Sequence, residues 1–229
     1  MGVNYNSKIV TDGLVLCLDA GNVKSYPGSG TTWTDLSGNG NNGALVNGVG
    51  YNSDNNGALT FDGVNDYIDC GNTSSLSAIG GTTNITVSGW AHYTAYGGGG
   101  QPYSVITVKG NPWTWLLENP YYTFRFRITA GGADVNIADT STHLLNIWYN
   151  VVGTYDGSNM RIYVNGVLKN TRAQTGTLAT NATTAKIGTF QGTNYNLTGR
   201  VSNVSIYNRA LTPQEIQQNF NATRGRYGI

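Results

Sequence analysis

Residues 148–170 read WYNVVGTYDGSNMRIYVNGVLKN and hold the clearest structural signal in the chain. Residues 148–154 predict a strand, and the Asp, Gly, Ser and Asn that follow predict a turn. In residues 160–164 apolar side chains alternate with more polar ones, as in a strand with one buried face. Asn165-Gly166 suits a two-residue type I′ turn, so the chain returns as a third strand at 167–169. This stretch therefore predicts an antiparallel meander.

Short strands of the same kind are expected along the rest of the chain. They cover residues 14–18, 44–46, 58–62, 67–70, 85–92, 105–108, 113–117, 123–128, 185–188 and 199–207. One helix is expected near the C-terminus, ending at 219 or 220, because Thr212, Pro213 and Glu215 form a capping box with proline at the first helical position. Many strands and one helix predict an all-β, two-sheet antiparallel jelly-roll sandwich with one short C-terminal helix.

Composition limits both the class of protein and its partners. Of the 229 residues 32 are glycine and only 11% are charged, which favours many turns between short strands. The net charge of +1 gives no field that would attract nucleic acid, and no apolar run is long enough to insert into a membrane. One sandwich over residues 13–220 is expected, with an N-terminal arm at 1–12 and a C-terminal tail at 221–229.

The two cysteines, Cys17 and Cys70, both lie in predicted strands. There a free cysteine acts as a small core hydrophobe, although a disulfide between the two stays an alternative. Two cysteines are too few for a cysteine-rich metal site or a disulfide scaffold.

Three blocks of sequence resemble the laminin-G-like, pentraxin-like branch of the concanavalin-A-like jelly rolls. They are GALTFDGVNDYI (57–68), GTYDGSNMRIYVNGVL (153–168) and GRVSNVSIYNRALTPQEI (199–216), in the order that the family shows. The third block departs from the family at Ser202-Asn203, where an acidic residue is usual, and this puts a metal ligand from that strand in doubt.

The opening segments resemble LamG-like structural proteins of tailed bacteriophages. They read IVTDGLVL (9–16), SYPGSGTTW (25–33) and DLSGNGNNG (35–43). This resemblance implies a non-enzymatic protein on the virion surface, a head decoration or a lectin-like module of the tail or fibre. Its partners would be capsid or tail proteins, further copies of itself and host surface glycans. The alternative is a secreted or cell-surface bacterial carbohydrate-binding module, located outside the cell.

Glycoside hydrolysis is the third reading, because jelly rolls of this kind include such enzymes. That chemistry needs two carboxyl groups on either side of the glycosidic bond. The chain has two glutamates: Glu118 is expected in a loop, and Glu215 belongs to the capping box. Nearby aspartates are expected at turns, so the sequence disfavours hydrolysis.

Calcium is the best candidate for a bound ion. Asp35, Ser37 and Asn39 place oxygen atoms at alternate positions of a glycine-rich loop, and Asp66 and Asp69 lie in another loop region that could complete a shell. The other reading is that these residues cap the turns in which they lie.

Contacts with glycans or protein partners are expected from aromatic residues between 93 and 122 and from the two ends of the chain. The aromatic candidates are Tyr96, Tyr103, Trp113, Trp115, Tyr121 and Tyr122. The candidate docking residues at the ends are Tyr5, Arg224, Arg226, Tyr227 and Ile229. Trp90 and Trp148 are expected in the core.

Overall fold

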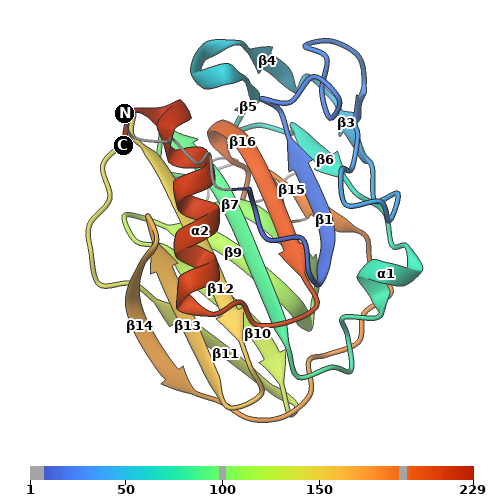
Figure 1. Ribbon diagram of the computed structural model, residues 1–229, viewed down its shortest axis with the longest axis vertical. Coiled ribbons are helices and arrows are strands. Elements are labelled where there is room, and N and C mark those ends of the chain that lie inside the picture. Colours follow the sequence, from blue (N-terminus) through green and yellow to red (C-terminus); the bar gives the residue numbers. More distant parts are fainter. Residues whose placement is uncertain (1–7, 98–101, 191–194) are drawn as a thin grey trace, which may run out of the picture.

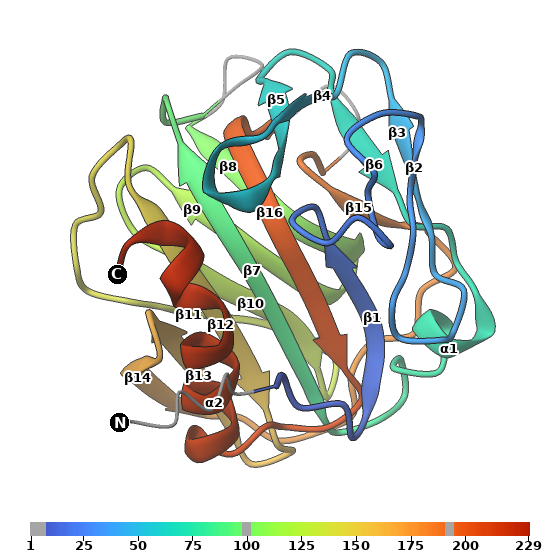
Figure 2. The same cartoon turned by 45° about the horizontal axis from the view of Figure 1, so that its top comes forward.

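The computed structural model describes residues 8–97, 102–190 and 195–229. Within them the chain forms two eight-stranded antiparallel sheets that pack face to face (Figures 1 and 2). The expected all-β jelly-roll sandwich with a C-terminal helix is confirmed. Tyr5 lies outside the described residues.

The first sheet, sheet A, contains the predicted meander. Its strands run in the order β14 (Val167–Ala173), β13 (Asn159–Val164), β12 (Trp148–Tyr155), β7 (Ile85–Tyr93), β16 (Thr198–Tyr207), β5 (Ala58–Asp62) and β4 (Gly50–Asn52), and β1 (Leu14–Asp19) pairs with β16. Asn165 and Gly166 both have positive φ, as the type I′ turn between β13 and β14 requires.

The second sheet, sheet B, supplies the opposite wall of the core. Its order is β11 (Ala133–Ala138), β10 (Arg125–Ala130), β9 (Trp113–Pro120), β8 (Tyr103–Gly110), β15 (Ala185–Ile187), β6 (Tyr67–Asp69), β3 (Gly43–Val46) and β2 (Thr32–Trp33). Two short helical segments lie between strands, the 3₁₀ turn η1 (Asp54–Asn56) and α1 (Ser74–Ser77). The longer helix α2 (Pro213–Thr223) and the 3₁₀ turn η2 (Arg224–Tyr227) follow the last strand.

The main core lies between the two sheets. Alternate residues of most strands point into it, among them Val87 and Ile206 from sheet A and Trp115 and Phe126 from sheet B. Cys17 and Cys70 are buried and both thiols are free, so the structure holds the reduced alternative. Burial raises the pKa of the Cys17 thiol to about 12, which keeps it protonated and inert at neutral pH.

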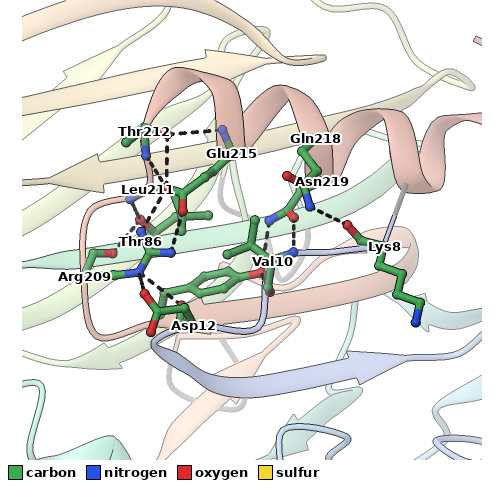
Figure 3. Close-up of polar contacts among 11 residues, drawn as sticks. Lys8, Val10, Asp12, Thr86, Arg209, Leu211, Thr212, Glu215, Gln218 and Asn219 are labelled. Atoms are coloured by element: carbon green, nitrogen blue, oxygen red, sulfur yellow. Dashed lines mark hydrogen bonds and ion pairs between the residues drawn. The ribbon is translucent and has the colours of Figure 1, made fainter. Parts of the chain in front are cut away.

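Helix α2 covers the outer face of sheet A (Figure 1). The capping box is present: Thr212 Oγ1 accepts from Glu215 N, and the Glu215 carboxylate accepts from Thr212 N. Arg209 adds a bidentate ion pair to Glu215, and this pair holds the pKa of Glu215 at about 2. Residues 8–12, expected in the N-terminal arm, lie beside the helix: Asn219 Oδ1 accepts from Val10 N (Figure 3).

The C-terminal segment is part of the packed fold and not a free tail. Helix α2 runs to Thr223, beyond the expected end, and η2 continues it. Tyr227 is buried and stacks on Trp90 at 4.0 Å between ring centroids. Arg226 forms a bidentate ion pair with Asp19 at 2.6 and 2.9 Å. Tyr227 and Arg226 would have to leave these contacts to reach a partner.

The other two candidate docking residues at the C-terminal end are exposed to solvent. Arg224 and Ile229 are exposed, and the Arg224 guanidinium lies 5.8 Å from the Phe220 ring centroid. A docking role for these two residues stays a prediction.

Candidate functional site

A pocket of about 290 Å³ lies on the outer face of sheet B, the face turned away from the core. Residues of strands β8, β9 and β10 line it, together with Phe190 and Tyr195. Its lining combines aromatic rings with charged groups: Tyr103, Val105, Asn111, Trp113, Leu116, Glu118, Arg125, Arg127, Phe190 and Tyr195. Apolar walls with a few converging polar groups are typical of a ligand site.

Two register shifts between β8 and β9 turn side chains toward this pocket. Trp115 pairs with Lys109 but Trp113 pairs with the very next residue, Gly110, so β9 holds one extra residue there. Trp113 therefore packs on the outer face with Leu116, while Trp115 lies in the core. Shifts of this kind redirect side chains and are common beside functional sites.

Glu118 and Arg125 form a buried ion pair in the pocket. They are direct cross-strand partners in β9 and β10, and Arg125 Nε and Nη2 contact Glu118 Oε1 at 2.7 and 2.5 Å. Glu118 is only 2% exposed, so burial raises the pKa of its carboxyl group, and the Arg125 charge opposes that rise. The expectation that Glu118 lies in a loop is wrong, because β9 continues to Pro120.

Glu118 keeps one carboxylate oxygen available. Among the residues that the structure describes, none donates a hydrogen bond to Oε2. Because Glu118 lines the pocket, this oxygen is an acceptor for a ligand hydroxyl group.

Arg127 forms the second ion pair of the site, with Asp134 of β11. Arg127 Nε donates to Asp134 Oδ1 at 2.7 Å, and Nη2 donates to Oδ2. The hydrogen bonds to Asp134 raise the pKa of Arg127, and those from Arg127 lower the pKa of Asp134. Each arginine also covers a ring: Arg127 lies 5.3 Å from the centroid of Trp113, and Arg125 lies 5.2 Å from that of Tyr103.

Five rings form a continuous series along the pocket. The centroid of Tyr103 lies 6.0 Å from Tyr121 and 5.2 Å from Tyr195. Phe190 lies 5.9 Å from Tyr195 and 4.6 Å from Trp113. Such contacts fix the orientation of the rings, so their faces form a preorganised apolar surface.

The six predicted aromatic contact residues lie in different parts of the structure. Tyr103 and Trp113 line the pocket, and Tyr121 touches Tyr103. Trp115 is fully buried in the main core. Tyr96 and Tyr122 lie apart from the pocket lining and pack edge to face at 4.5 Å. Phe190, Tyr195 and the two arginines were not among the predicted site residues.

The predicted calcium ligands are placed as turn-capping groups. Asp35 Oδ1 accepts from Cys17 N and Ser37 N, and Oδ2 accepts from Ser37 Oγ and Asn41 N. Asn39 donates through its amide to Val15 O at 3.0 Å. These bonds occupy both carboxylate oxygen atoms of Asp35.

The second loop makes the same kind of bond. Asp66 accepts from Gly48 N and Asp62 N, and Asp69 accepts from Gly71 N. Within the described ranges no group of three or more His, Cys, Asp or Glu side chains is placed to hold a metal. These contacts fit the turn-capping reading, which we favour over calcium binding.

The chain belongs to the concanavalin A-like lectin/glucanases superfamily. A laminin G family model with that description matches residues 61–217, more than half of the chain. A comparison with curated proteins finds no match. In the described part of the chain, no helix is both long and apolar enough to cross a membrane.

Several solved structures share the fold at low sequence identity. The binding domain of Paraclostridial Mosquitocidal Protein 1 matches with a TM-score of 0.72 and 17% identity over 93% of this chain and 52% of that one. The receptor-binding domain of botulinum neurotoxin type G gives a TM-score of 0.66 and 17% identity over 91% and 51%. A structure of botulinum neurotoxin type C, whose cell entry is described as dependent on two ganglioside molecules, gives 0.68 and 15% over 93% and 52%. This chain thus spans about half the length of these toxin domains.

Proposed function

We propose that this protein is a non-enzymatic carbohydrate-binding module, and that the glycan lies in the outer pocket of sheet B. The observation that carries the proposal is the Glu118–Arg125 pair set among fixed aromatic rings. Sugar rings combine apolar C–H faces, which pack on aromatic rings, with hydroxyl groups that donate and accept hydrogen bonds. Tyr103 and Tyr195 offer such faces, while Glu118 Oε2 accepts and the Arg125 guanidinium donates.

The electrostatics of the pocket suit a polar ligand without strong charge. Each of its arginines is paired with a carboxylate, Arg125 with Glu118 and Arg127 with Asp134. Neither pair leaves a free charge that would demand a counter-ion, so hydroxyl groups are the fitting partners of this pocket.

Binding without hydrolysis follows from the same two pairs. A glycosidase needs one protonated and one ionised carboxyl group across the scissile bond. Here the pocket carboxylate, Glu118, is held by Arg125, and Asp134 is held by Arg127. We therefore expect no release of reducing sugar from any polysaccharide that the protein binds.

The glycan-binding reading is preferred to a role in virion assembly. The virion reading rests on the sequence resemblance of three segments within residues 9–43. The similar solved structures are described as binding domains, one of them with gangliosides, which supports a ligand outside the chain. Location on a virion or outside a bacterial cell stays part of the proposal.

Replacing Tyr103 with alanine is expected to weaken glycan binding by about 30-fold, the effect of losing roughly 2 kcal/mol from an aromatic contact. A glycan array would first select a ligand, and calorimetry would then measure its affinity. Tyr122→Ala is the matched control, because Tyr122 is 51% exposed and lies outside the pocket lining. If Tyr122→Ala loses binding and Tyr103→Ala keeps it, the glycan site lies at the connection between β9 and β10 that holds Tyr122.

Lowering the pH is expected to weaken glycan binding. The loss is expected to begin above pH 4.5, the ordinary pKa of a glutamate carboxyl group, because burial raises the pKa of Glu118. The ionised carboxylate is the stronger acceptor for a hydroxyl group, so affinity is full above the raised pKa and falls as the pH drops through it. Calorimetry across pH 4–8 measures this, with Glu118→Gln as the variant that no longer titrates. An affinity that is flat across this range would exclude Glu118 as an acceptor.

A further inference from the structure

A second pocket of about 310 Å³ adjoins the first on the outer face of sheet B. Asn111 and Phe190 line both pockets, so the two lie side by side, and together they are called the groove below. The second half of the groove is lined by Lys186, Thr183 and Thr184. Its chemistry therefore differs from the aromatic half.

The register of sheet B places the two halves in one line of residues. Arg127 pairs with Leu116, Leu116 pairs with Val108, and Val108 pairs with Lys186. Arg127 and Lys186 are thus three strand spacings apart, about 14 Å, with apolar side chains between them. A ligand that reaches both must be longer than a single sugar ring.

Lys186 differs from the two arginines because it has no ion pair among the described residues. Its ammonium group lies 4.9 Å from the centroid of the Tyr67 ring, and within the described ranges it donates no hydrogen bond. The carboxylate beside it is Asp69, its cross-strand partner in β6. Asp69 accepts instead from Gly71 N at 2.8 Å and Thr184 Oγ1 at 3.2 Å, which leaves Lys186 available to an anion.

We infer that the groove binds an acidic oligosaccharide, with uncharged sugar residues over the aromatic half and a carboxylate or sulfate group at Lys186. The inference rests on the proposed glycan binding and specifies its substrate class. Thr183 and Asn111 stand beside Lys186 in the lining and supply further polar contacts to the sugar that carries the charge.

The test compares oligosaccharides that differ only in charge. The probes are hexagalacturonate and its methyl ester, and a sulfated galactan hexamer and its desulfated form, measured by calorimetry on the full chain. At least one acidic probe is expected to bind about tenfold more tightly than its neutral counterpart, and Lys186→Gln is expected to remove that difference. The preferred pair shows whether carboxylate or sulfate is recognised. The preference should shrink as salt concentration rises.

Two further variants separate the outcomes. Lys186→Arg keeps the positive charge and is expected to keep the acidic preference, and Lys169→Gln changes an exposed lysine of β14 and is expected to have no effect. Equal affinity for acidic and neutral probes, or an unchanged preference in Lys186→Gln, overturns the inference while Tyr103→Ala still tests glycan binding. If Tyr103→Ala leaves affinity unchanged but Lys186→Gln removes the acidic preference, the aromatic proposal falls and the anion site stands.

Discussion

Replacing Trp90 with alanine is expected to lower the free energy of unfolding by about 3–5 kcal/mol, the usual range for removing a buried tryptophan. Trp90 is 1% exposed and stacks between Phe220 and Tyr227, at 5.8 and 4.0 Å between centroids. Its Nε1 also donates to Thr223 Oγ1 at 2.9 Å. The substitution therefore removes the surface on which α2 and η2 pack, and denaturant titration followed by circular dichroism measures the loss.

Trp148→Ala is expected to act in the same way, because Trp148 belongs to the same cluster and lies 4.8 Å from the Tyr227 centroid. Tyr121→Ala serves as the control: that ring is 54% exposed, and the change is expected to stay within about 0.5 kcal/mol. If both tryptophan variants unfold at the wild-type denaturant concentration, the helix does not depend on this cluster.

Replacing Asp35 with alanine is expected to destabilise the fold by at least about 3 kcal/mol, because buried donors lose a charged acceptor. The carboxylate is 8% exposed and accepts four hydrogen bonds of 2.7–2.9 Å, three of them from the backbone N–H groups of Cys17, Ser37 and Asn41. Without it the N–H groups of Cys17 and Asn41 would lie buried and unpaired. Thermal and denaturant unfolding measure the effect. Asp35→Asn keeps one acceptor oxygen, so its stability is expected to lie between those of the wild type and Asp35→Ala.

The same variant separates the two readings of this loop. If Asp35 binds calcium, millimolar Ca²⁺ raises the wild-type melting temperature above its value in chelator, and Asp35→Ala loses that response. We expect the wild-type melting temperature to be the same in both conditions, because the hydrogen bonds already saturate the carboxylate. The control is Asp54→Ala, at an exposed aspartate of η1.

Local sequence patterns predicted much of the fold because each strand has one face on the core. Strand β5 spans the predicted residues 58–62, and the meander and the capping box are present as expected. Strand β11 was missed although Val135 and Ile137 alternate with polar residues. Its signal was the preceding Gly131-Gly132, both with positive φ, which forms the two-residue turn of a β10–β11 hairpin. Strands β2 and β4 have only two and three residues, which is too short to show the alternation of apolar and polar residues that marks a strand.

The candidate site was predictable only in part, because it is assembled by pairing between strands. Nothing in the local sequence links Arg125 and Arg127 to Glu118 or to Phe190, which lies more than 60 positions further on. The extra residue in β9 also breaks the period of two that would place Trp113 and Trp115 on one face. Sequence alone therefore gave Tyr103 and Trp113 without the charges that complete the pocket.

The location of α2 on one face of the sandwich and of the groove on the other separates stability from recognition. Trp90 and Trp113 lie in different hydrophobic clusters that share no residue, with the main core between them. Substitutions that share no partners have additive effects on the free energy of unfolding. A double-mutant cycle that pairs one substitution from each face should therefore give an interaction free energy near zero. Lys186 or Tyr103 can then be replaced to suit a new ligand without destabilising the packing under α2. Selection or library design can therefore vary the two faces independently.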